Sequence, residues 1–206
     1  MRPPWCERCG QPEPHFGPCR LCAEWPAALK TVRSAVWLVE GAQQAVYALK
    51  YGGLSRIADD LALVTAPLRP RTDGAPALIP IPLAPKRLQQ RGYNQSELLA
   101  RALARKWRIP VLPDLLSRTR ETPTQTALTP GTRLANVAGA FAVANVQRSM
   151  SNDQWTLNIG HSALIIVDDV FTTGATLAEA ARALAQAGAI TIHAVTFARA
   201  AIPDFT

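Results

Sequence analysis

Two patterns of apolar and polar residues alternate along the chain: short apolar runs, and segments with helical periodicity. Short apolar runs predict β-strands at 35–39, 77–82, 140–146, 163–167 and 190–197. Between these runs, apolar residues recur three and four positions apart, which predicts helices at 42–50, at about 55–68, at 94–107 and from about residue 176 to a cap at Gly188. Because strands alternate with helices, we expect a doubly wound α/β domain with a mainly parallel sheet.

The first 26 residues lack this periodicity and are rich in Pro, Gly and Cys. All four cysteines of the chain lie there, as Cys6-x-x-Cys9 and Cys19-x-x-Cys22. Two such pairs predict one structural Zn²⁺ site, because four thiolates complete a tetrahedral shell. The segment is too short to build a core, so metal binding must supply its folding energy. We therefore expect a small zinc-ribbon-like module over 1–28 and the α/β domain over 29–206.

A polar loop lies between the apolar run 163–167 and the last predicted helix. Its sequence is Asp168-Asp169-Val170-Phe171-Thr172-Thr173-Gly174-Ala175-Thr176. Backbone N–H groups at a helix N-terminus bind anions, and threonine hydroxyls can donate to phosphate oxygens. Neighbouring carboxylates at the carboxyl end of a strand can accept hydrogen bonds from vicinal hydroxyls. Together these groups predict a site for a sugar phosphate.

The segment Val167–Thr176 resembles the phosphoribosyl pyrophosphate (PRPP) signature of the type I phosphoribosyltransferases. In that family the acidic pair holds the ribose hydroxyls, and the Thr/Gly loop holds the 5′-phosphate. The resemblance thus implies a site for PRPP or a ribose 5-phosphate at Asp168, Asp169, Thr172, Thr173, Gly174, Ala175 and Thr176. Thr172 stands where the purine-salvage branch carries an Asp, which argues against hypoxanthine–guanine salvage.

Further segments resemble the ComF (competence protein F) branch of these proteins, and with the cysteine pairs they cover nearly the whole chain. They are Leu49-Lys50-Tyr51-Gly52-Gly53, the stretch from Pro80 to Gln95, and the stretch from Arg118 to Phe141. In the wider family the loop after the second strand cradles pyrophosphate, which implies Lys86, Arg87 and Arg91. A later loop closes over the site, which implies Arg118, Arg120, Thr124 and Gln125. Mg²⁺ is expected to bind together with PRPP.

Two functions are compatible with this resemblance. A ComF-like protein would keep the PRPP site and act in DNA uptake, transformation or DNA utilisation, with nucleic acid and a helicase-like protein as partners. The alternative is an active phosphoribosyltransferase that moves the 5-phosphoribosyl group from PRPP to a nitrogenous acceptor. The sequence assigns no catalytic residue and identifies no acceptor, so whether the protein is an enzyme stays open.

The charge of the chain favours polyanionic ligands. The net charge is +7, with an isoelectric point near 9.7. Arg101, Arg105 and Arg108 fall on one face of the predicted helix 94–107, which suits single-stranded DNA or simply a solvated face. No apolar run approaches the roughly 18–20 residues of a membrane span, and the N-terminus lacks the apolar stretch of a secretory signal. We therefore expect a cytoplasmic protein, and a dimer is one option for its oligomeric state.

Overall fold

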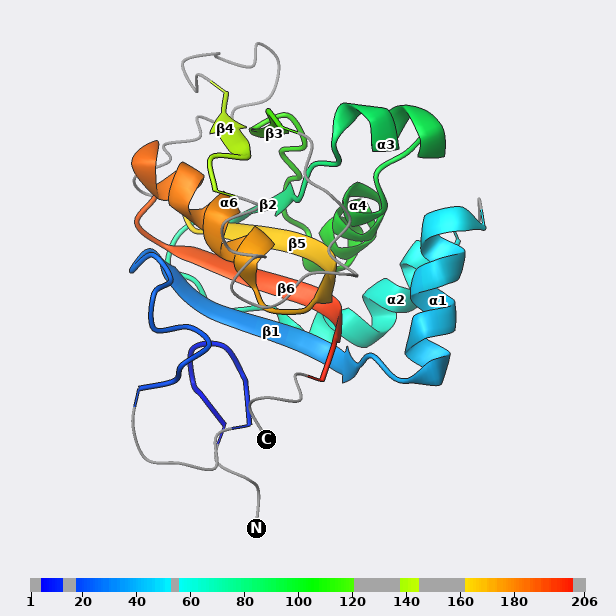
Figure 1. Cartoon of the computed structure of the whole chain (residues 1–206), viewed down its shortest axis with the longest axis horizontal. Helices are drawn as coiled ribbons and strands as arrows, with labels where there is room; N and C mark the ends of the chain where they lie inside the picture. Colours follow the sequence, from blue (N-terminus) through cyan, green and yellow to red (C-terminus); the bar gives the residue numbers. More distant parts are fainter. Residues whose placement is uncertain (1–4, 13–17, 53–55, 121–137, 145–161, 202–206) are drawn as a thin grey trace.

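The computed structural model of the chain contains a parallel β-sheet with helices on both faces (Figure 1). It describes residues 5–12, 18–52, 56–120, 138–144 and 162–201. The strands of the sheet, in spatial order, are β1 (Leu29–Trp37), β6 (Ile192–Arg199), β5 (Leu164–Phe171) and β2 (Ala77–Pro80). Each pairs with its neighbour in parallel. The predicted α/β fold with a mainly parallel sheet is therefore confirmed.

The sheet separates two hydrophobic cores. One face packs against α6 (Ala175–Gln186), and the other packs against α1 (Glu40–Tyr51), α2 (Ile57–Thr65) with the short 3₁₀ turn η1 (Ala66–Leu68), and α4 (Gln95–Trp107). Along β5, Leu164 and Ile166 belong to the first core, whereas Ile165 and Val167 belong to the second. A strand buried on both faces needs apolar side chains at successive positions, which explains the unbroken apolar run before the acidic pair.

The first strand begins earlier than the apolar pattern predicts. β1 starts at Leu29 and ends at Trp37, whereas the pattern predicts a strand at 35–39. β1 lies at the edge of the described sheet and pairs with β6 alone, so several of its positions are polar. Two of them contact β6 directly: the Thr31 hydroxyl lies 2.8 Å from His193 Nδ1, and Ser34 Oγ lies 2.7 Å from the Thr196 hydroxyl. These polar residues conceal the strand from an analysis based on apolar runs.

The loop that the resemblance places after the second strand, with Lys86, Arg87 and Arg91, contains a short helix instead. This helix, α3 (Pro85–Arg91), begins with a proline and ends before Gly92, whose φ is 78°. Proline is favoured in the first turn because its missing N–H would have no helical partner, and glycine is favoured just after the last turn. The prediction of a loop was therefore wrong, although both boundary signals are present in the sequence.

The predicted strand at 140–146 lies outside the parallel sheet. Its described part, β4 (Phe141–Val143), pairs in antiparallel fashion with β3 (Leu116–Arg118) and forms a separate two-stranded sheet. The backbone N–H of Gly139, just before β4, donates to the Glu179 side chain of α6 at 2.7 Å. The ComF-like stretch from Arg118 to Phe141 thus links the two strands of this sheet, and its residues 121–137 lie outside the described ranges.

Helix α4 has an N-terminal cap at Asn94. The Asn94 side-chain oxygen accepts a 3.1 Å hydrogen bond from the backbone N–H of Ser96. The Glu97 carboxylate, three residues after the cap, pairs with Arg101 at 2.7 Å. Arg105, the next arginine of the predicted basic stripe, pairs with an aspartate of α2. Carboxylates therefore offset the charge of two of the three arginines in that stripe.

Candidate functional site

Two neighbouring carboxylates lie near the end of β5. Asp168 and Asp169 follow the buried run 163–167, and the strand continues beyond them to Phe171. The Asp168 carboxylate accepts a hydrogen bond of 2.8 Å from the Ser96 hydroxyl and one of 2.9 Å from the backbone N–H of Asp169. Ligands of open α/β sheets bind at the carboxyl ends of the strands, so this pair occupies the position of a ligand site.

Asp169 is buried and is held by residues from two helices. Its carboxylate lies 2.6 Å from Nζ of Lys50 in the last turn of α1. The Gln95 amide, in the first turn of α4, donates to its other oxygen at 3.4 Å. The Tyr93 hydroxyl donates to the Leu49 carbonyl at 2.7 Å and joins the end of α1 to the start of α4. A buried carboxylate needs such partners, because an unpaired buried charge is very unfavourable.

The two carboxyl groups have opposite pKa shifts. Burial, and next the charge of Asp169, raises the pKa of Asp168 to about 8. Burial also acts to raise the pKa of Asp169, but the Lys50 ammonium and the surrounding hydrogen bonds outweigh it and lower that pKa. At neutral pH the pair therefore holds one proton and one negative charge between its two carboxyl groups. Such a pair can both donate hydrogen bonds to, and accept them from, vicinal sugar hydroxyls.

The loop after β5 has the features of a phosphate site. It consists of Thr172, Thr173 and Gly174, and α6 begins at Ala175 with Thr176 in its first turn. Gly174 has a φ of 77°, in the left-handed region that favours glycine. Thr173 is 8% exposed, and its hydroxyl oxygen has no hydrogen-bond partner within the described parts of the chain. A buried hydroxyl of this kind, at a helix N-terminus, can donate to a phosphate oxygen.

The loop rests on aromatic side chains. A Cβ atom added to Gly174 would lie 2.5 Å from Cζ2 of Trp25 and 2.8 Å from Cε2 of Phe171. The two rings meet edge to face, with centroids 6.1 Å apart and planes inclined by 67°. The guanidinium carbon of Arg199 lies 4.2 Å from the centroid of the Phe171 ring. Two features therefore require glycine at position 174: the left-handed backbone conformation and the close approach of these rings.

The three basic residues predicted to hold pyrophosphate all lie on α3. Lys86 is exposed, while Arg87 and Arg91 are partly exposed. The Arg91 guanidinium donates to the side-chain oxygen of Gln95, the residue whose amide also donates to the carboxylate pair. It also lies 5.0 Å from the centroid of the Tyr51 ring. One predicted pyrophosphate residue is therefore linked to the carboxylates through a single side chain.

One residue of the predicted closing segment lies within electrostatic reach of the same site. Arg118 ends β3, and burial followed by the charge of Arg87 lowers its pKa, whereas the charge of Asp168 raises it. Arg120 is exposed and donates to a backbone carbonyl next to β4 at 2.9 Å. The other two candidates, Thr124 and Gln125, lie outside the described residues.

Three residues that hold the carboxylate pair are absent from the predicted site: Lys50, Gln95 and Ser96. Gln95 and Ser96 are buried polar residues in the first turn of α4. Polar residues on the buried side of an amphipathic helix, directly after its cap, are the signal that could have indicated them. Lys50 belongs to one of the ComF-like segments, but the sequence does not show that α1 ends beside β5.

The four cysteines form one cluster with the spacing of a metal site. Their Sγ atoms all lie within 4.8 Å of one another, with Cys6–Cys22 and Cys9–Cys19 separations of 3.6 Å. A tetrahedral zinc ion with Zn–S bonds of about 2.3 Å holds its sulfur atoms about 3.8 Å apart. Disulfide-bonded sulfurs lie about 2.05 Å apart, so this cluster is not a pair of disulfides. The geometry fits a metal ion held by all four thiolates.

The cysteine segment packs directly on the α/β domain. Cys9 and Cys22 are buried in the core that α6 covers. Arg199, the last residue of β6, donates to the Cys9 carbonyl at 2.7 Å and to the Gln11 side-chain oxygen at 2.9 Å. Arg8 donates to several carbonyls of the segment that leads into β1. The two guanidinium groups can offset the negative charge of a metal bound by four thiolates.

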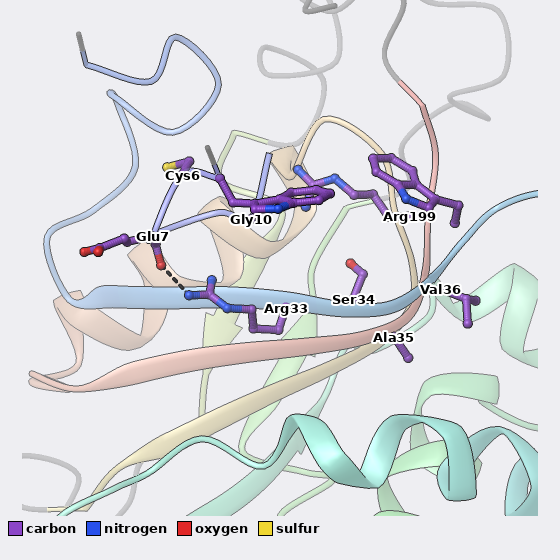
Figure 2. A pocket seen from close by; sticks show the side chains of 10 residues that line it. Cys6, Glu7, Gly10, Arg33, Ser34, Ala35, Val36 and Arg199 are labelled. Carbon is purple, nitrogen blue, oxygen red and sulfur yellow. Dashed lines mark hydrogen bonds between the residues drawn. The ribbon is translucent and has the colours of Figure 1, made fainter. Parts of the chain in front are cut away.

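A hollow of about 460 Å³ lies between the cysteine segment and β1 (Figure 2). Two of its lining side chains, Trp5 and Trp37, are 45% and 39% exposed, and their ring centroids lie 6.4 Å apart. Arg33 and Arg199 also line the hollow. Exposed tryptophan rings beside guanidinium groups can stack on nucleobases, so we name this feature the tryptophan hollow.

Comparison with known proteins agrees with this geometry. Residues 94–203, which include α4, the carboxylate pair and the threonine loop, match the family described as phosphoribosyl transferase domain. In the described parts of the chain, every helix is too short or too polar to span a membrane.

Relatives with assigned names match over most of the chain. The DNA utilization protein YhgH of Shigella flexneri is 31% identical over 195 residues, which cover 91% of this chain and 81% of the relative. Competence protein ComFC of Bacillus subtilis is 28% identical over 193 residues, or 89% of this chain and 72% of the relative. Competence protein F of Haemophilus influenzae is 36% identical over 124 residues, or 60% and 50%. The chain therefore belongs to the phosphoribosyltransferase family, in the ComF branch that its sequence resembles.

Proposed function

We propose that this protein binds PRPP, or a ribose 5-phosphate, at the end of β5 and acts in the uptake or utilisation of DNA in the cytoplasm. The observation that carries the ligand proposal is the carboxylate pair, held by the partly exposed Lys50 and the buried Ser96, directly before a glycine-containing loop that opens α6. The names of the relatives, which refer to DNA utilization and competence, support the cellular role.

The chain offers a distinct set of groups to each part of the ligand. Asp168 and Asp169 would hold the ribose hydroxyls, one as donor and one as acceptor at neutral pH. The Thr173 hydroxyl and the N-terminus of α6 would hold the 5′-phosphate. Arg87 and Arg91 would contact the diphosphate, because guanidinium groups match phosphate oxygens bidentately. A bound Mg²⁺ would neutralise part of the diphosphate charge.

The test is calorimetric titration of PRPP with Mg²⁺ into the protein and into the double variant Asp168→Asn/Asp169→Asn. Hydrogen bonds to charged groups contribute about 1.5–3 kcal/mol each, so affinity should fall at least about tenfold. The matched control is Asp59→Asn/Asp60→Asn, which changes another adjacent aspartate pair, exposed on α2. Equal affinity of the wild type and the first variant would refute the site, provided that both unfold cooperatively.

Phosphoribosyl transfer is the second candidate function. It is favoured by the position of Arg118, which lies within electrostatic reach of both Arg87 and Asp168 and could stabilise a departing pyrophosphate. In that reaction the bond from C1 of the ribose to pyrophosphate breaks, a bond from C1 to the acceptor nitrogen forms, and the nitrogen releases its proton. A screen of nitrogenous bases for PRPP-dependent pyrophosphate release tests this function. If the protein binds PRPP but releases no pyrophosphate with any base, the site has a binding function and no transferase activity.

Zn²⁺ is the metal that we propose for the cysteine cluster, since four thiolates in tetrahedral spacing suit it best. For nucleic acid we propose single-stranded DNA, with the tryptophan hollow as its contact surface. This assignment replaces the arginine stripe of α4 as the first candidate, because carboxylates offset two of the three arginines there. A helicase-like protein partner is part of the same proposed role.

A further inference from the structure

The threonine loop and the cysteine cluster, far apart in sequence, are joined by the side chain of Trp25. Trp25 is 6% exposed and follows the last cysteine by three residues. Its Cζ2 edge lies where a Cβ atom on Gly174 would be placed, so the indole ring directly supports the backbone of the loop. The same ring packs edge to face on Phe171, the last residue of β5.

The position of Trp25 is set by the first cysteine pair. Arg8, between Cys6 and Cys9, donates to the Cys22 carbonyl at 2.9 Å, to the Trp25 carbonyl at 3.1 Å and to the next carbonyl at 2.7 Å. Its guanidinium carbon also lies 5.9 Å from the centroid of the Trp25 ring. A metal ion that joins Cys6 to Cys22 would therefore fix both the segment that carries the donor, Arg8, and the segment that carries the accepting carbonyls.

A second connection reaches the loop from the other side. Arg199 donates to the carbonyl of Cys9 and stacks on the Phe171 ring (Figure 2 shows Arg199 beside the cysteine segment). The Phe171 carbonyl accepts a 2.8 Å hydrogen bond from Ala200 N–H. Phe171 is thus in contact with Arg199 and with Trp25, and both residues are hydrogen-bonded to the cysteine segment.

From these contacts we propose that the metal-bound cysteine cluster sets the conformation of the threonine loop, with Trp25 as the positioning residue. Loss of the metal would release Arg8 and Trp25, and the loop would lose its support at Gly174. Affinity for PRPP is therefore coupled to metal occupancy, and by linkage bound PRPP strengthens metal binding by the same free energy. The affinity part rests on the proposed PRPP site, whereas the conformational part does not.

Amide hydrogen exchange tests the conformational part without any ligand. Elemental analysis should first give about one metal ion per chain, and less than about a tenth of that after chelation. Exchange in residues 172–176 should become at least about tenfold faster after metal removal, and also in metal-loaded Trp25→Ala, while residues 99–104 of α4 keep their protection. Unchanged exchange in the loop would overturn the proposal. Equal acceleration in both segments would also overturn it, because Trp25 would then support the whole fold rather than the loop.

Titration with PRPP and Mg²⁺ tests the coupling. Affinity should fall at least about tenfold in Trp25→Ala, and Trp25→Phe, which keeps a ring against Phe171, should recover most of it. Leu63→Ala, which removes an exposed apolar side chain of α2 away from the proposed sites, is the control and should keep the wild-type affinity. Equal affinity of Trp25→Ala and wild type would overturn the coupling. If wild type does not bind PRPP, the proposed ligand is wrong, and the exchange measurement alone still decides the conformational part.

Discussion

Lys50 is the residue whose removal should most clearly change the carboxylate site. Its ammonium lies 2.6 Å from the Asp169 carboxylate, which is 6% exposed, while the lysine side chain itself is 27% exposed. Removing one partner of a fully buried ion pair costs about 3–5 kcal/mol, since the other charge is left unpaired. Water reaches Lys50 in part, so we expect Lys50→Met to lower the free energy of unfolding by about 1.5–3 kcal/mol at pH 7.

Urea denaturation of four proteins gives the required cycle: wild type, Lys50→Met, Asp169→Asn and the double variant. The double variant should be more stable than the sum of the single effects predicts, because it leaves no unpaired charge. The paired state of Asp169 has a lowered pKa, so its contribution is present above about pH 4 and is lost as the pH falls further. The deficit of Lys50→Met should therefore shrink in acid.

Lys106→Met, an exposed lysine on α4, is the matched control and should change stability by less than about 0.5 kcal/mol. Additive effects in the cycle, or a deficit for Lys50→Met no larger than that of the control, would show that the pair does not hold the site together.

Two further predictions concern protonation and nucleic acid. Because the folded pKa of Asp168 is raised to about 8 while an unfolded aspartate titrates near 4, this group makes stability fall as the pH rises between these values; Asp168→Asn should reduce that fall, and identical pH profiles of unfolding free energy would contradict the shift. Oligo-dT should quench tryptophan fluorescence and bind with a log–log salt slope of about −0.7 per contacted phosphate. Replacing Trp5 and Trp37 by Ala should lower that affinity by about tenfold or more, whereas equal affinity would place the contact surface elsewhere.

The sequence predicts the central part of the fold well because that part obeys simple burial rules. The run before Asp168 is apolar without interruption, since β5 is covered on both faces, and the threonine loop with its glycine is a local motif. The apolar pattern predicts the start of edge strand β1 too late in the chain. The reason is that polar residues in its first part form hydrogen bonds with β6, so they interrupt the apolar pattern. Helix α3 was missed because it is short, and none of its residues is buried.

The site was predictable where one segment supplies the groups, and was not where distant segments meet. The carboxylate pair and the loop lie within one stretch of sequence. Lys50, in contrast, reaches Asp169 from the first helix, and Ser96 reaches Asp168 from the fourth. Trp25 is in the same situation: nothing in its neighbourhood along the chain indicates that it packs on Gly174. Such pairings depend on how the helices are placed around the sheet, which periodicity does not specify.

The order of strands also determines when during synthesis the molecule can be completed. β6 is the last strand of the sheet along the chain, yet it lies between β1 and β5, so β1 lacks its neighbour until residues 192–199 leave the ribosome. Cys9 accepts its hydrogen bond from a residue 190 positions later. The cysteines can therefore capture a metal early, whereas the surface on which they dock forms last. Contacts of such long range slow folding, and a chain that stops before β6 would leave both β1 and the cysteine segment open to proteases.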